Sequence, residues 1–177
     1  MALMITVRSL CLLLVVGVLL LSPLGVSATV NDDKYDGNIF VLYGGNGSLV
    51  PPRVTLQQSL EELHRPALLF FYVDDSADCK RVTPLLNQVQ LYYSKLVSII
   101  PTSVDSLIAD KATAKYYGGL VPQWVLVNTD NEVVYNYEGL PEPADLDKAL
   151  RSVLGIEIPS PMAKLKNDSP FFNEFNR

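Results

Sequence analysis

The chain has 177 residues, of which 49% are hydrophobic, and its formal net charge is −5. This length accommodates one domain with additional segments. Because the chain is acidic and contains no run of Lys or Arg, we expect it to bind neither nucleic acid nor anionic lipid head groups. A single histidine and scattered carboxylates give no zinc-ligand spacing, so we also expect no metal and no cofactor.

Residues 1–28 are typical of an export signal. Arg8 precedes an apolar run from Leu10 to Leu21, and the segment ends in Val26-Ser27-Ala28. A charged start, a short apolar middle and a small-residue end predict a signal peptide that is cleaved after Ala28. The alternative is an uncleaved membrane anchor, because residues 10–26 reach the lower length limit for crossing the hydrocarbon layer. In both cases we expect the body of the protein to face a non-cytoplasmic space.

Residues 29–54 are predicted to form an N-terminal arm and a short strand ahead of the main domain. The polar residues 29–38 suggest an extended arm, and the run Ile39–Tyr43 suggests the strand. A glycine-rich cluster, Gly44–Gly47, comes next. Because no lysine and no helix start follow this cluster, we interpret it as a turn and not as a phosphate-binding loop.

Residues 55–154 alternate between helical and strand patterns, as in an α/β domain. Thr55 and Gln58 form a capping box at the start of the first helix, and His64 at its end is interpreted as a surface residue and not as a catalytic base. The predicted elements are helix 55–63, buried strand 67–73, a long helix from 79 to about 96 interrupted at Pro84, buried strand 97–102, helix 105–117, a hairpin of strands 124–128 and 132–137, and helix 144–154 capped by Gly155. They describe a mixed central sheet with helices on both faces.

Residues 155–177 are predicted to be a C-terminal tail. The stretch 156–177 contains three prolines and little hydrophobic periodicity. Phe171, Phe172 and Phe175 make it more adhesive than a linker, which suggests docking onto the body or onto a partner.

The segment Phe70–Pro84 resembles the active-site strand and helix of thioredoxins. That family has an aromatic strand, a Cys-x-x-Cys-Lys motif and a proline that kinks the following helix. Here Cys79-Lys80 matches the second cysteine and its lysine, and Pro84 matches the kink. Val121-Pro122 resembles the cis-proline loop of the family, and residues 132–139 resemble the strand after that loop. Four matches in this order imply a thioredoxin-like fold for most of the predicted domain.

The motif departs from the family at its first position, where Ser76 stands in place of the attacking cysteine. In the family reaction the first cysteine attacks as a thiolate that the helix N-terminus stabilises, and the second cysteine resolves the mixed disulfide. A serine hydroxyl does not form that intermediate. Asp74, Asp75 and Asp78 are expected to oppose ionisation of the Cys79 thiol. We therefore expect no dithiol exchange and no enzymatic activity of that kind.

Cys79 is the only cysteine outside the leader, since Cys11 lies within the apolar run, so cleavage would leave no internal disulfide. Two interpretations of Cys79 stay open. It is either a partly buried, small apolar residue in the first helical turn, or a thiol that forms a disulfide with a partner or senses redox state. Lys80 is predicted to be a solvated helix residue, and the only tryptophan, Trp124, is expected to point into the core.

The resemblance also implies a binding surface. In thioredoxins, the backbone beside the cis-proline pairs with an extended segment of the client polypeptide. Val121, Pro122 and Gln123 are therefore expected to contribute to partner binding without redox chemistry. Tyr72 and Asp75, next to the motif, are predicted to belong to the same surface, and the alternative for Tyr72 is a core ring.

Two stretches of the chain resemble the cyanobacterial thylakoid-membrane photosystem I accumulation factors. These stretches are residues 35–52 and 71–80. Members of that family are thioredoxin-like, carry one N-terminal hydrophobic segment, and are thought to support assembly or stability of photosystem I. The resemblance implies a non-catalytic assembly factor on the lumenal side of the thylakoid membrane. Its partners would be photosystem I subunits or other assembly factors, and the N-terminal segment would contact the membrane.

Two other functions remain open on the sequence alone. Cys79 would serve a monothiol redox enzyme or sensor in an exported compartment. The cis-proline loop would equally serve a general chaperone outside photosynthesis, located in the periplasm or secreted. Thiol reactivity separates the first alternative from an assembly factor, and the identity of the bound clients separates the second.

Overall fold

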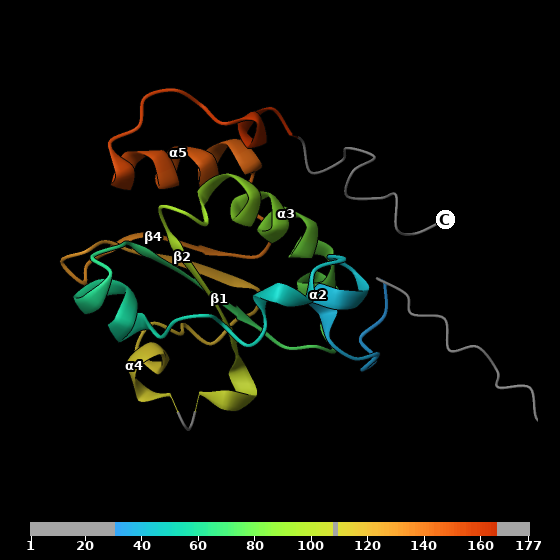
Figure 1. Ribbon diagram of the computed structural model, residues 1–177. Helices are drawn as coiled ribbons and strands as arrows, with labels where there is room; N and C mark the ends of the chain where they lie inside the picture. Colours follow the sequence, from blue (N-terminus) through green and yellow to red (C-terminus); the bar gives the residue numbers. More distant parts are fainter. Residues whose placement is uncertain (1–30, 108–109, 166–177) are drawn as a thin grey trace, which may run out of the picture.

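The computed structural model describes residues 31–107 and 110–165 (Figure 1). The predicted leader and the three phenylalanines near the C-terminus lie outside these residues. Within the described ranges, no helix combines the length and the apolar character that crossing a bilayer requires.

The core of the molecule is a four-stranded mixed sheet with the strand order β2-β1-β3-β4. Its strands are β1 (Ala67–Tyr72), β2 (Ser98–Ser103), β3 (Gln123–Val127) and β4 (Val133–Glu138). β1 pairs in parallel with β2 and antiparallel with β3, and β3 pairs antiparallel with β4. The two predicted buried strands and the hairpin are therefore confirmed, with ends that shift by about one residue.

Helices cover both faces of this sheet (Figure 1). One face packs against α2 (Ile39–Leu42), α3 (Ala77–Tyr93) and α5 (Pro143–Leu154). The other face packs against the helical turn η2 (Gln58–Glu62) and the segment that follows α4 (Lys111–Ala114). Successive side chains of β1 point to opposite faces of the sheet and enter the two hydrophobic cores in turn. Every residue of this strand is therefore buried. The predicted fold class, a mixed sheet with helices on both faces, is confirmed.

Several local sequence signals have the expected structure. The main-chain N–H of Gln58 donates to the Thr55 hydroxyl, and the main-chain N–H of Thr55 donates to the side-chain oxygen of Gln58. These two hydrogen bonds complete the capping box. Pro84 lies inside α3, and Gly155 ends α5 in the left-handed conformation. Trp124 is fully buried, and its indole N–H donates to the Gly139 carbonyl at 2.9 Å.

The predicted strand Ile39–Tyr43 is wrong, because residues 39–42 form helix α2. Asn38 caps this helix, since its side chain accepts hydrogen bonds from the Phe40 and Val41 N–H groups. The glycine cluster after α2 forms a turn as predicted and leads into the short 3₁₀ helix η1 (Gly47–Leu49).

The predicted helix 105–117 is also wrong. The chain forms a 3₁₀ turn, η3 (Val104–Ser106), and then the separate short helix α4. Asp110 separates the two, because its side chain accepts from the Ala112 and Thr113 N–H groups and caps a new helix start.

Part of the predicted C-terminal tail packs onto the domain. Residues 161–164 form the 3₁₀ helix η4 (Pro161–Lys164), which carries the fully buried Met162. The Ser160 hydroxyl hydrogen-bonds to the buried carboxylate of Asp147 on α5. The stretch up to residue 165 therefore belongs to the folded body.

Candidate functional site

The altered redox motif lies at the N-terminal end of α3, directly after the carboxyl end of β1. Ser76 is the N-cap of α3, and its hydroxyl accepts a hydrogen bond from the Cys79 N–H at 3.2 Å. Serine is one of the residues preferred at this position, because its side chain satisfies an otherwise unpaired helical N–H group. Ser76 thus has a structural role where a thioredoxin would carry its nucleophile.

Cys79 lies in the first turn of α3, and its side chain is fully buried in the core. Burial is the largest cause that raises the pKa of its thiol, and the charges of Asp78 and Asp74 raise it further. Hydrogen bonds from Ser76 and the Val73 backbone act in the opposite direction without reversing the shift. The expected opposition from nearby carboxylates therefore includes Asp78 and Asp74 but is secondary to burial. Such a thiol is poor both as a nucleophile and as a target for reagents.

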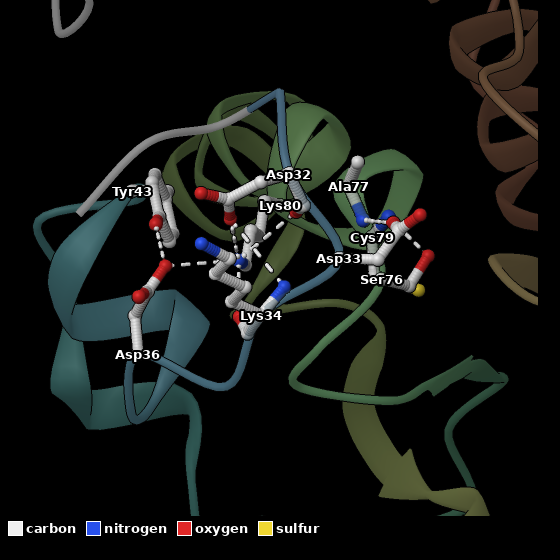
Figure 2. Close-up of polar contacts among 9 residues, drawn as sticks. All are labelled: Asp32, Asp33, Lys34, Asp36, Tyr43, Ser76, Ala77, Cys79 and Lys80. Atoms are coloured by element: carbon white, nitrogen blue, oxygen red, sulfur yellow. Dashed lines mark hydrogen bonds and ion pairs between the residues drawn. The ribbon is translucent and has the colours of Figure 1, made fainter.

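Lys80 is not the solvated residue that we predicted, because its side chain is 0% exposed. Its ammonium group donates to the Asp36 carboxylate at 2.9 Å and to the Asp32 carboxylate at 3.2 Å (Figure 2). It also donates to the main-chain carbonyls of Lys34 at 2.6 Å and of Asp32 at 3.2 Å. We call this set of contacts the Lys80 clamp. It ties the N-terminal arm to helix α3.

Charge and hydrogen bonding reinforce each other in the Lys80 clamp. Burial alone would lower the pKa of Lys80, but hydrogen bonds to Asp36 and Asp32 outweigh it and raise the pKa above its ordinary value. Hydrogen bonds from Tyr43 and Lys80 hold the pKa of Asp36 below its ordinary value. The Tyr43 hydroxyl donates to Asp36 at 2.6 Å, and burial together with this contact raises the pKa of Tyr43 to about 12. Lys80 and Asp36 therefore both stay charged at neutral pH.

Another residue of the N-terminal arm lies at the N-terminus of α3 itself. The Asp33 carboxylate accepts a hydrogen bond from the Ala77 N–H at 2.8 Å, beside Ser76 and Cys79 (Figure 2). The first N–H groups of a helix carry partial positive charge and favour an anion. In the reaction of thioredoxins this is the place where the attacking thiolate is stabilised. Here a carboxylate from the chain itself takes that place.

The cis-proline loop has the expected geometry. The peptide bond between Val121 and Pro122 is cis. The Gly139 N–H donates to the Pro122 carbonyl at 2.7 Å, while the main chain of Val121 makes no hydrogen bond within the described parts of the chain. Leu120, just before this loop, is 60% exposed. An unpaired main-chain segment beside an exposed leucine is a suitable edge for an extended polypeptide.

The remaining predicted site residues divide into buried and exposed. Gln123 is fully buried, and its side-chain amide bonds to Gly118, Tyr116 and Asn136, so this side chain supports the loop from inside. Tyr72 is 4% exposed and packs against two phenylalanine rings, which makes it the core ring that we named as the alternative. Asp75 is exposed next to the motif. The residues described contain no cluster of metal-ligating side chains.

Sequence reasoning missed four residues of this region: Asp32, Asp33, Asp36 and Leu120. The acidic residues of the arm were visible as a cluster, but their partners lie more than 40 positions further along the chain. Leu120 stands in a glycine-containing loop, where no periodicity indicates whether a side chain is exposed.

The strand order, the motif that opens the helix after β1, and the cis-proline loop before β3 define a thioredoxin-like protein. Among solved structures, mitochondrial thioredoxin 3 from Saccharomyces cerevisiae is 20% identical, with a TM-score of 0.42 over 50% of this chain and 79% of that one. The germline-specific thioredoxin Deadhead from Drosophila melanogaster is 20% identical, with a TM-score of 0.38 over 43% of this chain and 70% of that one.

A closer relationship exists to a cyanobacterial protein. The chain is 40% identical over 154 residues to the thylakoid membrane protein slr1796 of Synechocystis sp., which covers 84% of this chain and 75% of the relative. The chain therefore belongs to the same family as that thylakoid membrane protein, and this kinship supports an association with the thylakoid membrane. No family model matches the chain.

Proposed function

We propose that the chain is a non-catalytic, thioredoxin-like binding protein on the lumenal side of the thylakoid membrane, where it supports the accumulation of photosystem I. The observation that carries the proposal is the state of the motif. Ser76 is engaged as a helix cap, and the sulfur of Cys79 is buried. Because neither group presents a nucleophile at the surface, the motif favours binding over disulfide exchange.

The cis-proline loop supplies the proposed binding surface. Leu120 offers exposed apolar area, and the Val121 main chain offers an unpaired N–H and C=O for strand addition. Asp75 is exposed next to the motif, and its part in this binding surface remains a prediction. A client would be held by main-chain hydrogen bonds and one apolar contact, and no covalent intermediate is needed.

The biological setting rests on two further arguments. The export-type leader at residues 1–28 favours a non-cytoplasmic position for the body, which at a thylakoid membrane is the lumen. The resemblance of residues 35–52 and 71–80 to photosystem I accumulation factors suggests the client: photosystem I subunits or other assembly factors. The alternative, a monothiol redox protein or sensor, needs a reactive Cys79, and the burial of this thiol argues against it.

Partner capture from native membranes tests the binding mode. The tagged chain, Cys79→Ser and Leu120→Asp should be compared with the matched control Leu91→Asp, since Leu91 is a similarly exposed leucine on α3. We expect wild type, Cys79→Ser and Leu91→Asp to retain the same photosystem I subunits or assembly proteins. Leu120→Asp should lose at least about tenfold of them, because a buried charge at the loop opposes docking. Loss of the partners in Cys79→Ser alone would contradict the proposal in favour of the redox alternative.

A deletion strain tests the physiological role. We expect less photosystem I per cell, restored by wild type and by Cys79→Ser but not by Leu120→Asp. Normal photosystem I content under both low and high light would remove the proposed role.

A further inference from the structure

A cavity of about 630 Å³ lies at the end of the sheet where β1 and β2 begin, opposite to the end that carries the motif. Arg65 precedes β1, and Lys95 precedes β2 just after the end of α3. Arg53, from the segment after η1, completes a set of three cationic side chains in the cavity lining. We call this space the tricationic cavity.

Among the residues that the structure describes, the lining of the tricationic cavity contains no Asp or Glu. Within residues 31–107 and 110–165, the head groups of Arg53, Arg65 and Lys95 form no ion pair and no hydrogen bond. Three unpaired positive charges repel one another, and their mutual repulsion is relieved when an anion enters the space between them.

Other cavities of the same size have mixed charge. A 630 Å³ cavity between β4 and α5 is lined by Lys148 together with Asp130 and Asp145. A 600 Å³ cavity beside α4 is lined by Lys111 and Lys115 together with Glu61 and Asp130. In an acidic chain of net charge −5, a carboxylate-free cavity is a local exception to the repulsion of anions that the composition predicts.

Lys95 differs from the two arginines because it lies next to the C-terminal end of α3. It follows Ser94, the C-cap of α3, where the helix dipole places about half a negative charge. Lys95 offsets this partial charge, so Arg53 and Arg65 provide the net attraction. Guanidinium groups bind phosphate-type oxyanions through paired, parallel hydrogen bonds, and the Ser94 and Ser98 hydroxyls in the lining are further donors.

We propose that the tricationic cavity binds a phosphate group, with Arg53 and Arg65 as its principal ligands. The lining also contains apolar side chains, among them Leu63 and Val97, so a phosphate that carries an apolar substituent fits the same space. The group therefore comes either from a soluble phosphate compound or from the head group of a phospholipid. This site is independent of the motif and of the cis-proline loop.

The test is an amide NMR titration of the full chain in a neutral detergent at constant ionic strength. The probes are inorganic phosphate, glycerol phosphate, and micelles doped with phosphatidylglycerol. We expect saturable shifts at Arg65, Lys95 and Ser98 and none at the motif. Response to the soluble probes as well as the lipid supports a soluble source, and response to the doped micelles alone supports a lipid source.

The double variant Arg53→Gln/Arg65→Gln should raise the phosphate concentration at half-saturation at least about tenfold, because two paired guanidinium contacts are lost. The control Lys148→Gln/Lys164→Gln removes the same charge elsewhere on the surface. It should leave the phosphate concentration at half-saturation within about twofold of the wild-type value. If the first double variant does not fold, Arg53→Gln alone, whose side chain is exposed, provides the comparison. Equal weakening in both double variants, shifts that never saturate, or saturation by tetraglutamate without any response to phosphate would overturn the proposal.

Discussion

The two ends of helix α3 differ in how their charges are balanced. At the N-terminal end, Lys80 is matched by Asp32 and Asp36, and Asp33 takes the helix N-terminus. At the C-terminal end, the described residues that line the tricationic cavity include three cations and no carboxylate. At the N-terminal end, where thioredoxins carry their nucleophile, the charges make structural contacts, whereas at the opposite end we propose that the cations bind a ligand. Each prediction below perturbs the N-terminal end, where the balance is complete.

Removal of the clamp cation should have the largest effect. Lys80→Met keeps the length of the side chain but leaves the Asp36 carboxylate, which is 8% exposed, without its cation. We expect a loss of about 3 kcal/mol in the free energy of unfolding, measured by urea titration of the full chain. The matched control is Arg81→Met, because Arg81 forms an exposed pair with Asp78 and should cost less than about 0.5 kcal/mol. Equal losses in the two variants would mean that the clamp does not stabilise the fold.

The clamp should also give the stability a defined pH dependence. The pKa of Asp36 is lowered on folding, so its contribution is present above the ordinary value of 3.8 and is lost as the pH falls through the folded value. The pKa of Lys80 is raised, so its contribution is present below 10.5 and is lost as the pH rises through the folded value.

The stability difference between wild type and Asp36→Asn should therefore stay constant from about pH 5 to about pH 9 and shrink below about pH 4. Urea titrations at each pH measure it. A difference that is unchanged at pH 3 would show that the Asp36 charge does not act through the clamp.

A thiol placed at the family's first position reports on Asp33. In the background Ser76→Cys/Cys79→Ala, the carboxylate of Asp33 should hinder ionisation of the new thiol at the helix N-terminus. Adding Asp33→Asn should lower the pKa of that thiol by about one unit, measured by the pH dependence of alkylation. Asp130→Asn, in the distant hairpin turn, is the control and should leave it unchanged. An identical thiol pKa with and without the Asp33 charge would contradict the idea that this carboxylate takes the place of the thiolate at the helix N-terminus.

The smallest effect is expected at the cysteine itself. Cys79→Ala removes one buried sulfur atom and should cost about 1 kcal/mol of unfolding free energy. The proposed function gives the thiol no role beyond packing, so it predicts that partner capture is unaffected. A variant with unchanged stability but lost partners would show that the sulfur acts in binding.

The sequence predicted the parts of this molecule that local patterns determine. The apolar run of β1, the capping box at Thr55 and Gln58, and the glycine that ends α5 each carry their own physical cause within a few residues. The cis-proline loop followed from a resemblance, and the structure has it.

What the sequence did not predict depends on distant contacts or on competing local signals. Lys80 was expected in solvent because its carboxylate partners lie 44 and 48 positions earlier in the chain. Ile39–Tyr43 has the composition of a strand, but the Asn38 cap turns it into a helix. Gln123 and Tyr72 were assigned to a binding surface from the resemblance to thioredoxins, but both side chains are buried, which for Tyr72 was the stated alternative.

Disulfide turnover by the purified chain tests the central claim most directly. The assay is reduction of insulin disulfides by a dithiol, with the Cys79→Ser variant as the baseline for contaminating reductases. We predict equal rates for the two proteins, because Ser76 supplies no attacking sulfur and Cys79 is buried. Multiple turnovers by wild type that disappear in Cys79→Ser would contradict the account.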